Sequence, residues 1–162
     1  MKSVAQAGVE LVINLAPHDV PNAILDEPEL VEALGMDYLN IPVNWNTPTR
    51  DGLDFFMDAM DCNRDKSILV HCEANFRASA FITIYRILRL DWDPEEAFEV
   101  MHTIWDEDAF PVWRMVIEDA KLTGDNSQFS ANEQKQHGYH IDIAKEIRQM
   151  DVYHLPDQGT AI

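Results

Sequence analysis

The stretch that decides the fold runs from residue 67 to residue 79 and reads SILVHCEANFRAS. Its first part, 67–71, is a short apolar run, which is typical of a strand covered on both faces. A polar loop follows, and over 78–90 apolar residues recur at helical spacing. A buried strand that turns through a short loop into a helix is the repeating unit of a parallel α/β sheet.

Strands and helices alternate through the rest of residues 1–124. Apolar runs predict further strands at 9–15 and 38–43, and helical periodicity predicts helices at 28–34, from 49 onward, from 94 to about 105 and at 109–121. Asp93, Pro94 and Glu96 form a helix start with an N-cap acid, a proline at N1 and a glutamate at N3. We therefore expect an α/β domain over 1–124, with a short, mainly parallel sheet flanked by helices.

Residues 125–162 differ in composition. The part up to residue 140 is rich in Asn, Gln and Ser, and 141–150 has apolar residues at helical spacing. We expect a polar C-terminal extension that is partly helical or loosely ordered.

Composition excludes several function classes. The 162 residues carry 12 Lys and Arg against 29 Asp and Glu, a net charge of −17, which would repel nucleic acid. No apolar run reaches the roughly 18–20 residues of a membrane span. The two cysteines fit a reducing compartment, so we expect a cytoplasmic protein. The abrupt start at residues 1–8 leaves open a missing upstream strand or targeting segment.

Cys72 and Arg77 are the residues that point to chemistry. A loop between a strand and a helix presents backbone N–H groups to an anion, and the same field favours a cysteine thiolate at its base. Arg77 offers a two-pronged clamp for an oxyanion, and Ser79 offers a hydrogen bond to the thiolate. We expect His71 to support the loop by hydrogen bonding. The sequence therefore predicts an anion site with a nucleophilic cysteine.

Other residues carry weaker signals. Cys62 lacks such a context and is expected to be structural. His18 and Asp19 follow the first strand, where an ordinary polar loop is favoured over a lining role. His137 and His140 have no further ligands at metal spacing nearby, so we predict no metal site there. We expect three tryptophans, Trp92, Trp105 and Trp113, in the core or in a groove.

The segment His71-Cys72, with Arg77 and Ser79, resembles the signature loop of cysteine-dependent protein tyrosine and dual-specificity phosphatases. The resemblance covers about residues 7–122 and includes AGVELVINL (7–15), Ile41-Pro42-Val43, ILVHC (68–72) and DPEEAFEVMHTIW (93–105). The chain resembles in particular small bacterial phosphatase-like proteins of the DUF442 type. The implied fold is that of the protein tyrosine phosphatases.

The resemblance also implies a reaction and a site. The Cys72 thiolate would attack phosphorus to form a cysteinyl-phosphate, while Arg77 and the loop amides hold the phosphate oxygens and Ser79 assists the leaving thiolate. The implied substrate is a phosphorylated small molecule or a phosphoprotein, and a phosphate- or sulfate-type anion would occupy the loop. No metal or organic cofactor is implied. The implied substrate-binding residues are Asn44, Trp45, Asn46, His71, Glu73, Ala74, Asn75 and Phe76.

The loop departs from the pattern of these phosphatases. Their loop has five residues between cysteine and arginine, whereas four separate Cys72 from Arg77. Either the loop is one residue short, or the arginine has moved one place earlier, so that Ala78 stands where these phosphatases have the arginine. The loop also lacks a glycine, so Asn75 is the residue best suited to a left-handed turn. Glu73 adds a negative charge beside the anion.

The general acid departs as well. The segment after Ile41-Pro42-Val43 usually carries an aspartate that protonates the leaving oxygen, but here it reads Asn44-Trp-Asn-Thr-Pro48. Asp51 is the nearest candidate and Asp106 a more distant one, and each also fits a plain surface carboxylate.

Two other functions stay open at this point. The spacing of Cys72 and Arg77 also resembles the loop of single-domain rhodaneses, which carry sulfur on the cysteine as a persulfide. The three helices predicted after the loop argue against a rhodanese fold. The missing acid also fits a catalytically weak phosphatase-like module that binds an anion or a partner.

Overall fold

The computed structural model describes residues 1–20 and 23–124, and these contain a three-stranded parallel sheet. The strands are β1 (Leu11–Asn14), β2 (Asp37–Asn40) and β3 (Ile68–His71), in the order β2-β1-β3. Both neighbouring pairs run parallel. The predicted α/β class with a short parallel sheet is confirmed. The expected extension at 125–162, including His137 and His140, lies outside the described residues.

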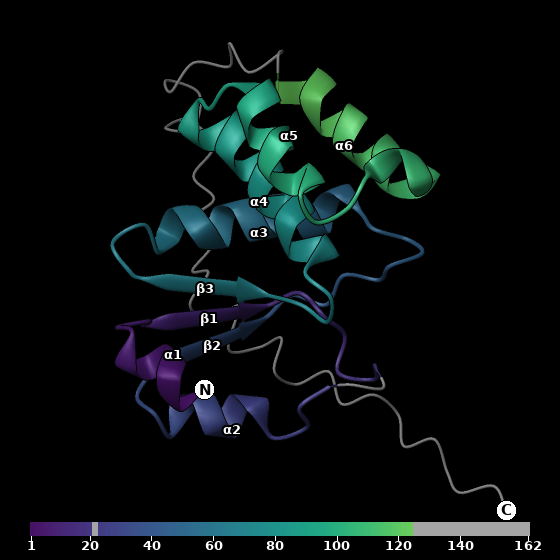
Figure 1. Cartoon of the computed structure of the whole chain (residues 1–162). Helices are drawn as coiled ribbons and strands as arrows, with labels where there is room; N and C mark the ends of the chain where they lie inside the picture. Colours follow the sequence, from purple (N-terminus) through teal and green to yellow (C-terminus); the bar gives the residue numbers. More distant parts are fainter. Residues whose placement is uncertain (21–22, 125–162) are drawn as a thin grey trace, which may run out of the picture. The chain divides into compact units, whose positions relative to one another are not determined.

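Helices cover both faces of the sheet (Figure 1). On one face, Val12 of β1 packs with Val31 and Met36 near α2 and with side chains of α1. The other face is covered by α3 and α4, and α5, η1 and α6 follow and lie beyond them. The helices are α1 (Lys2–Gln6), α2 (Glu27–Glu32), α3 (Arg50–Cys62), α4 (Phe76–Leu90), α5 (Pro94–His102), η1 (Glu107–Ala109) and α6 (Pro111–Gly124).

Local capping explains where two of these helices begin. The Thr49 side chain accepts a hydrogen bond from the Gly52 amide at the start of α3. The Asp93 carboxylate accepts from the amides of Glu95 and Glu96, and Pro94 occupies the first turn of α5. Both arrangements satisfy amides that a helix leaves free at its N-terminus. The predicted start of α5 at Asp93-Pro94 is therefore confirmed.

The structure corrects several predicted elements. The first 8 residues include a short helix, α1, and β1 covers only Leu11–Asn14 of the expected 9–15. The second strand ends at Asn40, whose side-chain amide donates to the carbonyls of Asn14 and Ala16. Helix α5 ends at His102, earlier than expected. All four residues of β3 are half-buried, because β3 lies at an edge of this sheet.

Two of the three tryptophans expected in the core or a groove are in the core. Trp113 and Trp105 are 0% and 6% exposed, which confirms their prediction. Trp92 is 38% exposed and lies under the Arg86 guanidinium, 4.5 Å from its ring centre, so that prediction is wrong. Among the described residues, no helix is both long and apolar enough to cross a membrane.

Candidate active site

The loop after β3 holds Cys72 at its base and enters α4 through a left-handed residue. Cys72 is half-buried, and Asn75 has φ 65° and ψ 6°, which confirms the expected left-handed turn. Helix α4 begins at Phe76, two residues earlier than predicted, so Arg77 belongs to its first turn. Asparagine tolerates this conformation better than other residues with a side chain, which lets the helix begin directly after it.

The first turn of α4 leaves several donors open. The amides of residues 74–77 donate to no acceptor among the described residues. An isolated helix end normally finds water or a side-chain cap, but Asn75 makes no side-chain cap here. The open amides and the positive end of the helix dipole together favour an anion at this position.

Arg77 adds a buried positive charge to these amides. Arg77 is only 7% exposed, and its Nε is buried without a hydrogen-bond partner in the described part of the chain. The guanidinium carbon lies 5.8 Å from the ring centre of Trp45, a cation–π contact. A buried N–H without an acceptor is costly, and an oxyanion in the loop would supply the missing acceptor.

An aromatic cluster holds the 41–49 segment against this loop. Trp45 lies 5.8 Å from Phe76 between ring centres, and Phe76 stacks on Trp105 at 5.4 Å. The indole N–H of Trp113 in α6 donates to the Trp45 carbonyl at 2.9 Å. Of the predicted substrate residues in this segment, the structure therefore brings Trp45 to the loop. Asn44 and Asn46 are exposed, and the Asn46 amide donates to the Asn44 side chain.

Ser79 makes contacts other than the one expected from the sequence. Its hydroxyl donates to the Phe76 carbonyl at 3.0 Å and accepts from the indole N–H of Trp105 at 2.9 Å. In this arrangement the hydroxyl hydrogen points to the helix backbone, so donation to a Cys72 thiolate requires the hydroxyl to rotate. Ser79 thus links the start of α4 to the aromatic cluster.

Sequence reasoning missed a buried polar cluster beside Cys72. Glu27, only 2% exposed, accepts from the Asn14 side-chain amide at 2.8 Å and from the Tyr38 hydroxyl at 3.1 Å. His71 lies 3.2 Å from the other Glu27 oxygen. Burial, followed by the nearby Glu27 charge, raises the pKa of Tyr38. Glu27 escaped notice because acids in the first turn of a helix are usually solvated.

A cavity of about 230 Å³ opens beside Cys72. His18, Glu27, His71, Cys72 and Glu73 are among its lining residues, so His18 does line the site, whereas the sequence favoured an ordinary polar loop. A larger open hollow of about 610 Å³ lies elsewhere. It is lined by residues of α5, by Thr103 directly after α5 and by Lys121 of α6, and none of the candidate site residues lines it.

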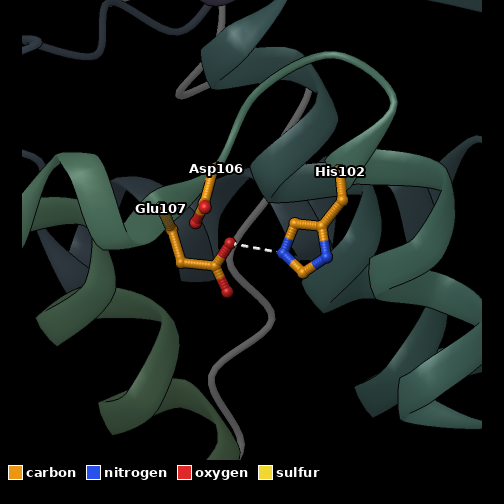
Figure 2. A group of neighbouring side chains, drawn as sticks. All are labelled: His102, Asp106 and Glu107. Atoms are coloured by element: carbon orange, nitrogen blue, oxygen red, sulfur yellow. Dashed lines mark hydrogen bonds and ion pairs between the residues drawn. The ribbon is translucent and has the colours of Figure 1, made fainter.

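The two candidate acids occupy helix starts. Asp51 is exposed in the first turn of α3, where its negative charge interacts favourably with the positive end of the helix dipole. Asp106 is exposed and accepts a hydrogen bond from the Asp108 amide. Figure 2 shows Asp106 beside Glu107 and His102, which pair at 2.7 Å. Potential metal-ligand atoms of these three residues lie within 4.8 Å of one another, and the contacts named here account for the group without an ion.

Both cysteines are free, and Cys62 is exposed at the end of α3.

The strand, loop and helix that carry Cys72 and Arg77, on a short parallel sheet, define the fold of the protein tyrosine phosphatases. Pseudomonas aeruginosa TpbA in complex with pTyr shares it, with 19% identity, a TM-score of 0.57 and coverage of 77% of this chain and 78% of that chain. PTPMT1 in complex with PI(5)P also shares it, with 17% identity, a TM-score of 0.56 and coverage of 75% and 85%.

A phosphatase-like DUF442 protein from Shewanella putrefaciens CN-32 is 37% identical, with a TM-score of 0.68 over 75% of this chain and 77% of that chain. The chain therefore belongs to the DUF442 family of phosphatase-like proteins. No family model matches the chain, and no curated protein matches it. The rhodanese-like alternative receives no support from these neighbours.

Proposed function

We propose that this chain is a cysteine-dependent hydrolase of phosphomonoesters. The observation that carries the proposal is Arg77, a buried guanidinium with an unpartnered Nε beside the open amides of the loop that starts at Cys72. These donors suit a tetrahedral oxyanion, and Cys72 at the base of the loop suits attack on its central atom. Membership of the DUF442 family and the fold shared with phosphatases support the same reading.

The proposed reaction has two steps. In the first, the Cys72 thiolate forms an S–P bond while the P–O bond to the leaving group breaks, and the leaving oxygen takes a proton from an acid or from water. In the second, water attacks phosphorus, the P–S bond breaks, and inorganic phosphate and the thiolate are released. Arg77 and the amides of 73–77 hold the non-bridging oxygens through both steps.

Three further assignments belong to the proposal. Asp51 is the candidate general acid. Ser79 assists the leaving thiolate after its hydroxyl turns away from the Phe76 carbonyl. Trp45, with Asn44 and Asn46, forms the side of the site that receives the rest of the substrate, a phosphorylated small molecule or a phosphoprotein.

The test is steady-state hydrolysis of p-nitrophenyl phosphate at about pH 5–7, where the good leaving group needs little help from an acid. Cys72→Ser and Arg77→Ala should abolish turnover. The matched controls are Cys62→Ser, which removes the exposed thiol of α3, and Arg86→Ala, which removes a guanidinium of α4 that lies on Trp92. Both controls should keep their turnover. Turnover that survives Cys72→Ser, or no turnover in the unmodified chain, contradicts the proposal.

A further inference from the structure

The cavity of about 230 Å³ beside Cys72 has walls of two kinds. Cys72 and Glu73 bring the start of the candidate anion loop to one wall, and Pro17 and Ile24, from the segment between β1 and α2, give an apolar wall. None of residues 44–46 lines it. At about 30 Å³ for each water molecule, the space is large enough for a short organic group. The cavity is therefore a place for part of a small ligand, separate from the side of the site formed by Trp45.

Glu27 also lines this cavity, and the fold holds its carboxyl group in place. Its Oε2 accepts hydrogen bonds from the Asn14 side-chain amide at 2.8 Å and from the Tyr38 hydroxyl at 3.1 Å. Asn14 is itself fixed, because its Oδ1 accepts from the Ala16 amide at 2.8 Å. Both donors to Oε2 come from strands of the sheet, Asn14 from β1 and Tyr38 from β2. The carboxyl group is thus anchored through one of its two oxygens.

The other oxygen of Glu27, Oε1, is buried and has no hydrogen-bond partner among the described residues. Glu27 as a whole is only 2% exposed. Nε2 of His71 lies 3.2 Å from Oε1, without the alignment of a hydrogen bond. Buried polar atoms of folded proteins are nearly always paired, and an oxygen in the lining of a cavity can be paired by a bound molecule. Oε1 therefore suits a hydrogen-bond donor on a ligand.

We propose that this cavity is a subsite for the leaving group of the substrate, and that Glu27 selects phosphomonoesters whose leaving group carries a hydroxyl or an amino group close to the ester. The inference rests on the proposed function, in which Arg77 and the loop amides hold the phosphate. The hydroxyl or amino hydrogen donates to Oε1, and the carbon atoms beside it pack on Pro17 and Ile24. A purely alkyl leaving group of the same size leaves Oε1 unpaired, so it binds less tightly.

The charges around the cavity favour the same class of substrate. Glu73 is exposed at the loop, and the described lining contains no lysine or arginine. The whole chain has a net charge of −17. A second anionic group on the leaving side would meet these carboxylates, whereas a neutral hydroxyl or a cationic amino group would not be repelled. The subsite therefore also selects against leaving groups that carry a carboxylate or a second phosphate.

The experiment compares three esters that have the same number of non-hydrogen atoms and differ in one terminal group: propyl, hydroxyethyl and aminoethyl phosphate. Calorimetry measures their binding to the full chain carrying Cys72→Ser, which prevents turnover. The hydroxyethyl and aminoethyl esters should each bind about tenfold more tightly than the propyl ester. Equal binding of all three, or binding of none, overturns the inference. An advantage of the aminoethyl ester alone that disappears at high salt also overturns it, because the general field would then be responsible.

Glu27→Gln, added to the same chain, assigns the preference to Oε1. The glutamine oxygen can take over the donors from Asn14 and Tyr38, which places an N–H₂ group where Oε1 stands. The preference over the propyl ester should fall to about twofold or less. Glu29→Gln removes an exposed carboxylate from the same helix, and it should leave the preference unchanged. A folded Glu27→Gln chain that keeps the preference overturns the inference. If this variant does not fold, the comparison of the three esters still decides.

The subsite and the hydrolase can fail separately, since the calorimetry needs no hydrolysis. A preference for the hydroxyethyl and aminoethyl esters, without turnover of p-nitrophenyl phosphate by the unmodified chain, contradicts the hydrolase alone. Turnover that depends on Cys72, together with equal affinity for the three esters, contradicts the subsite alone.

Discussion

The indole N–H of Trp105 donates a 2.9 Å hydrogen bond to the hydroxyl of Ser79, and this contact fastens the first turns of α4 to the aromatic cluster beside the Cys72 loop. Both residues are buried, with exposures of 6% and 8%. The hydroxyl in turn donates to the Phe76 carbonyl. The helix start that carries Arg77 is therefore held by Trp105, which lies 26 positions after Ser79 in the sequence.

Replacing Trp105 with Phe should weaken this attachment. Phenylalanine keeps an aromatic ring but is smaller than the indole and has no N–H, so a small cavity forms and the buried Ser79 hydroxyl loses a donor. The free energy of unfolding should therefore fall by about 1–3 kcal/mol. Urea unfolding measures this, and kcat/KM for p-nitrophenyl phosphate should fall with it. Trp92→Phe, at an exposed tryptophan, is the control. Equal effects of the two substitutions would show that the contact does not support the loop.

Replacing Trp45 with Leu should weaken anion binding. Trp45 faces the Arg77 guanidinium at 5.8 Å and packs against Phe76 with its ring tilted, so its loss removes a cation–π contact that orients the clamp. We expect vanadate to inhibit about three- to tenfold less tightly. Trp92→Leu removes a comparable contact with Arg86 on the surface and should leave inhibition unchanged. Unaltered vanadate inhibition in the Trp45 variant would contradict this role.

Replacing Glu73 with Gln should strengthen anion binding. Glu73 is exposed in the loop, and its carboxylate repels a phosphate dianion through solvent. The inhibition constant for inorganic phosphate should fall about threefold at low salt, and the gain should shrink as salt screens the repulsion. Glu29→Gln serves as the control for a general change in net charge. A gain that persists at high salt would mean that a direct contact, rather than the field, is responsible.

Replacing Asp51 with Asn should separate substrates by leaving group. If Asp51 protonates the leaving oxygen, hydrolysis of phenyl phosphate should fall at least about tenfold, while p-nitrophenyl phosphate, whose leaving group is already stable, should change little. Asp106→Asn should affect neither, because Asp106 caps η1. An equal loss on both substrates would assign Asp51 to the stability of α3 instead.

Tyr38 makes the free energy of unfolding depend on pH in the alkaline range. Burial raises the pKa of its hydroxyl in the folded chain, whereas in the unfolded chain it titrates near pH 10. The unfolded state therefore releases this proton first, and above about pH 10 the free energy of unfolding should fall by about 1.4 kcal/mol per pH unit from this group. Below pH 10 the full stabilisation is present. Tyr38→Phe should remove that part of the slope between pH 10 and 11 in chemical unfolding, and an unchanged slope would contradict the assignment.

The sequence predicted the local structure around the site closely. The apolar run before Cys72 and the helical spacing after it predicted the strand and the helix, and Asn75 was identified as the left-handed residue. These features depend on neighbours in the chain, through backbone sterics and apolar periodicity. The exact start of α4 was missed, because an asparagine in the left-handed conformation lets the helix begin at Phe76.

The sequence by itself determined the strand-loop-helix unit, its thiol and its arginine, because side-chain periodicity and turn preference act over a few residues. Only the tertiary structure decided what surrounds them. It placed Trp45 against Arg77 and Trp105 on Ser79, and it buried Glu27 beside His71, 44 positions away in the sequence. The contacts of Trp45 and of Glu27 arise because parallel strands bring the segments at their ends to one edge of the sheet, whereas Trp105 comes from the segment between α5 and η1. No local pattern records which acid becomes buried there.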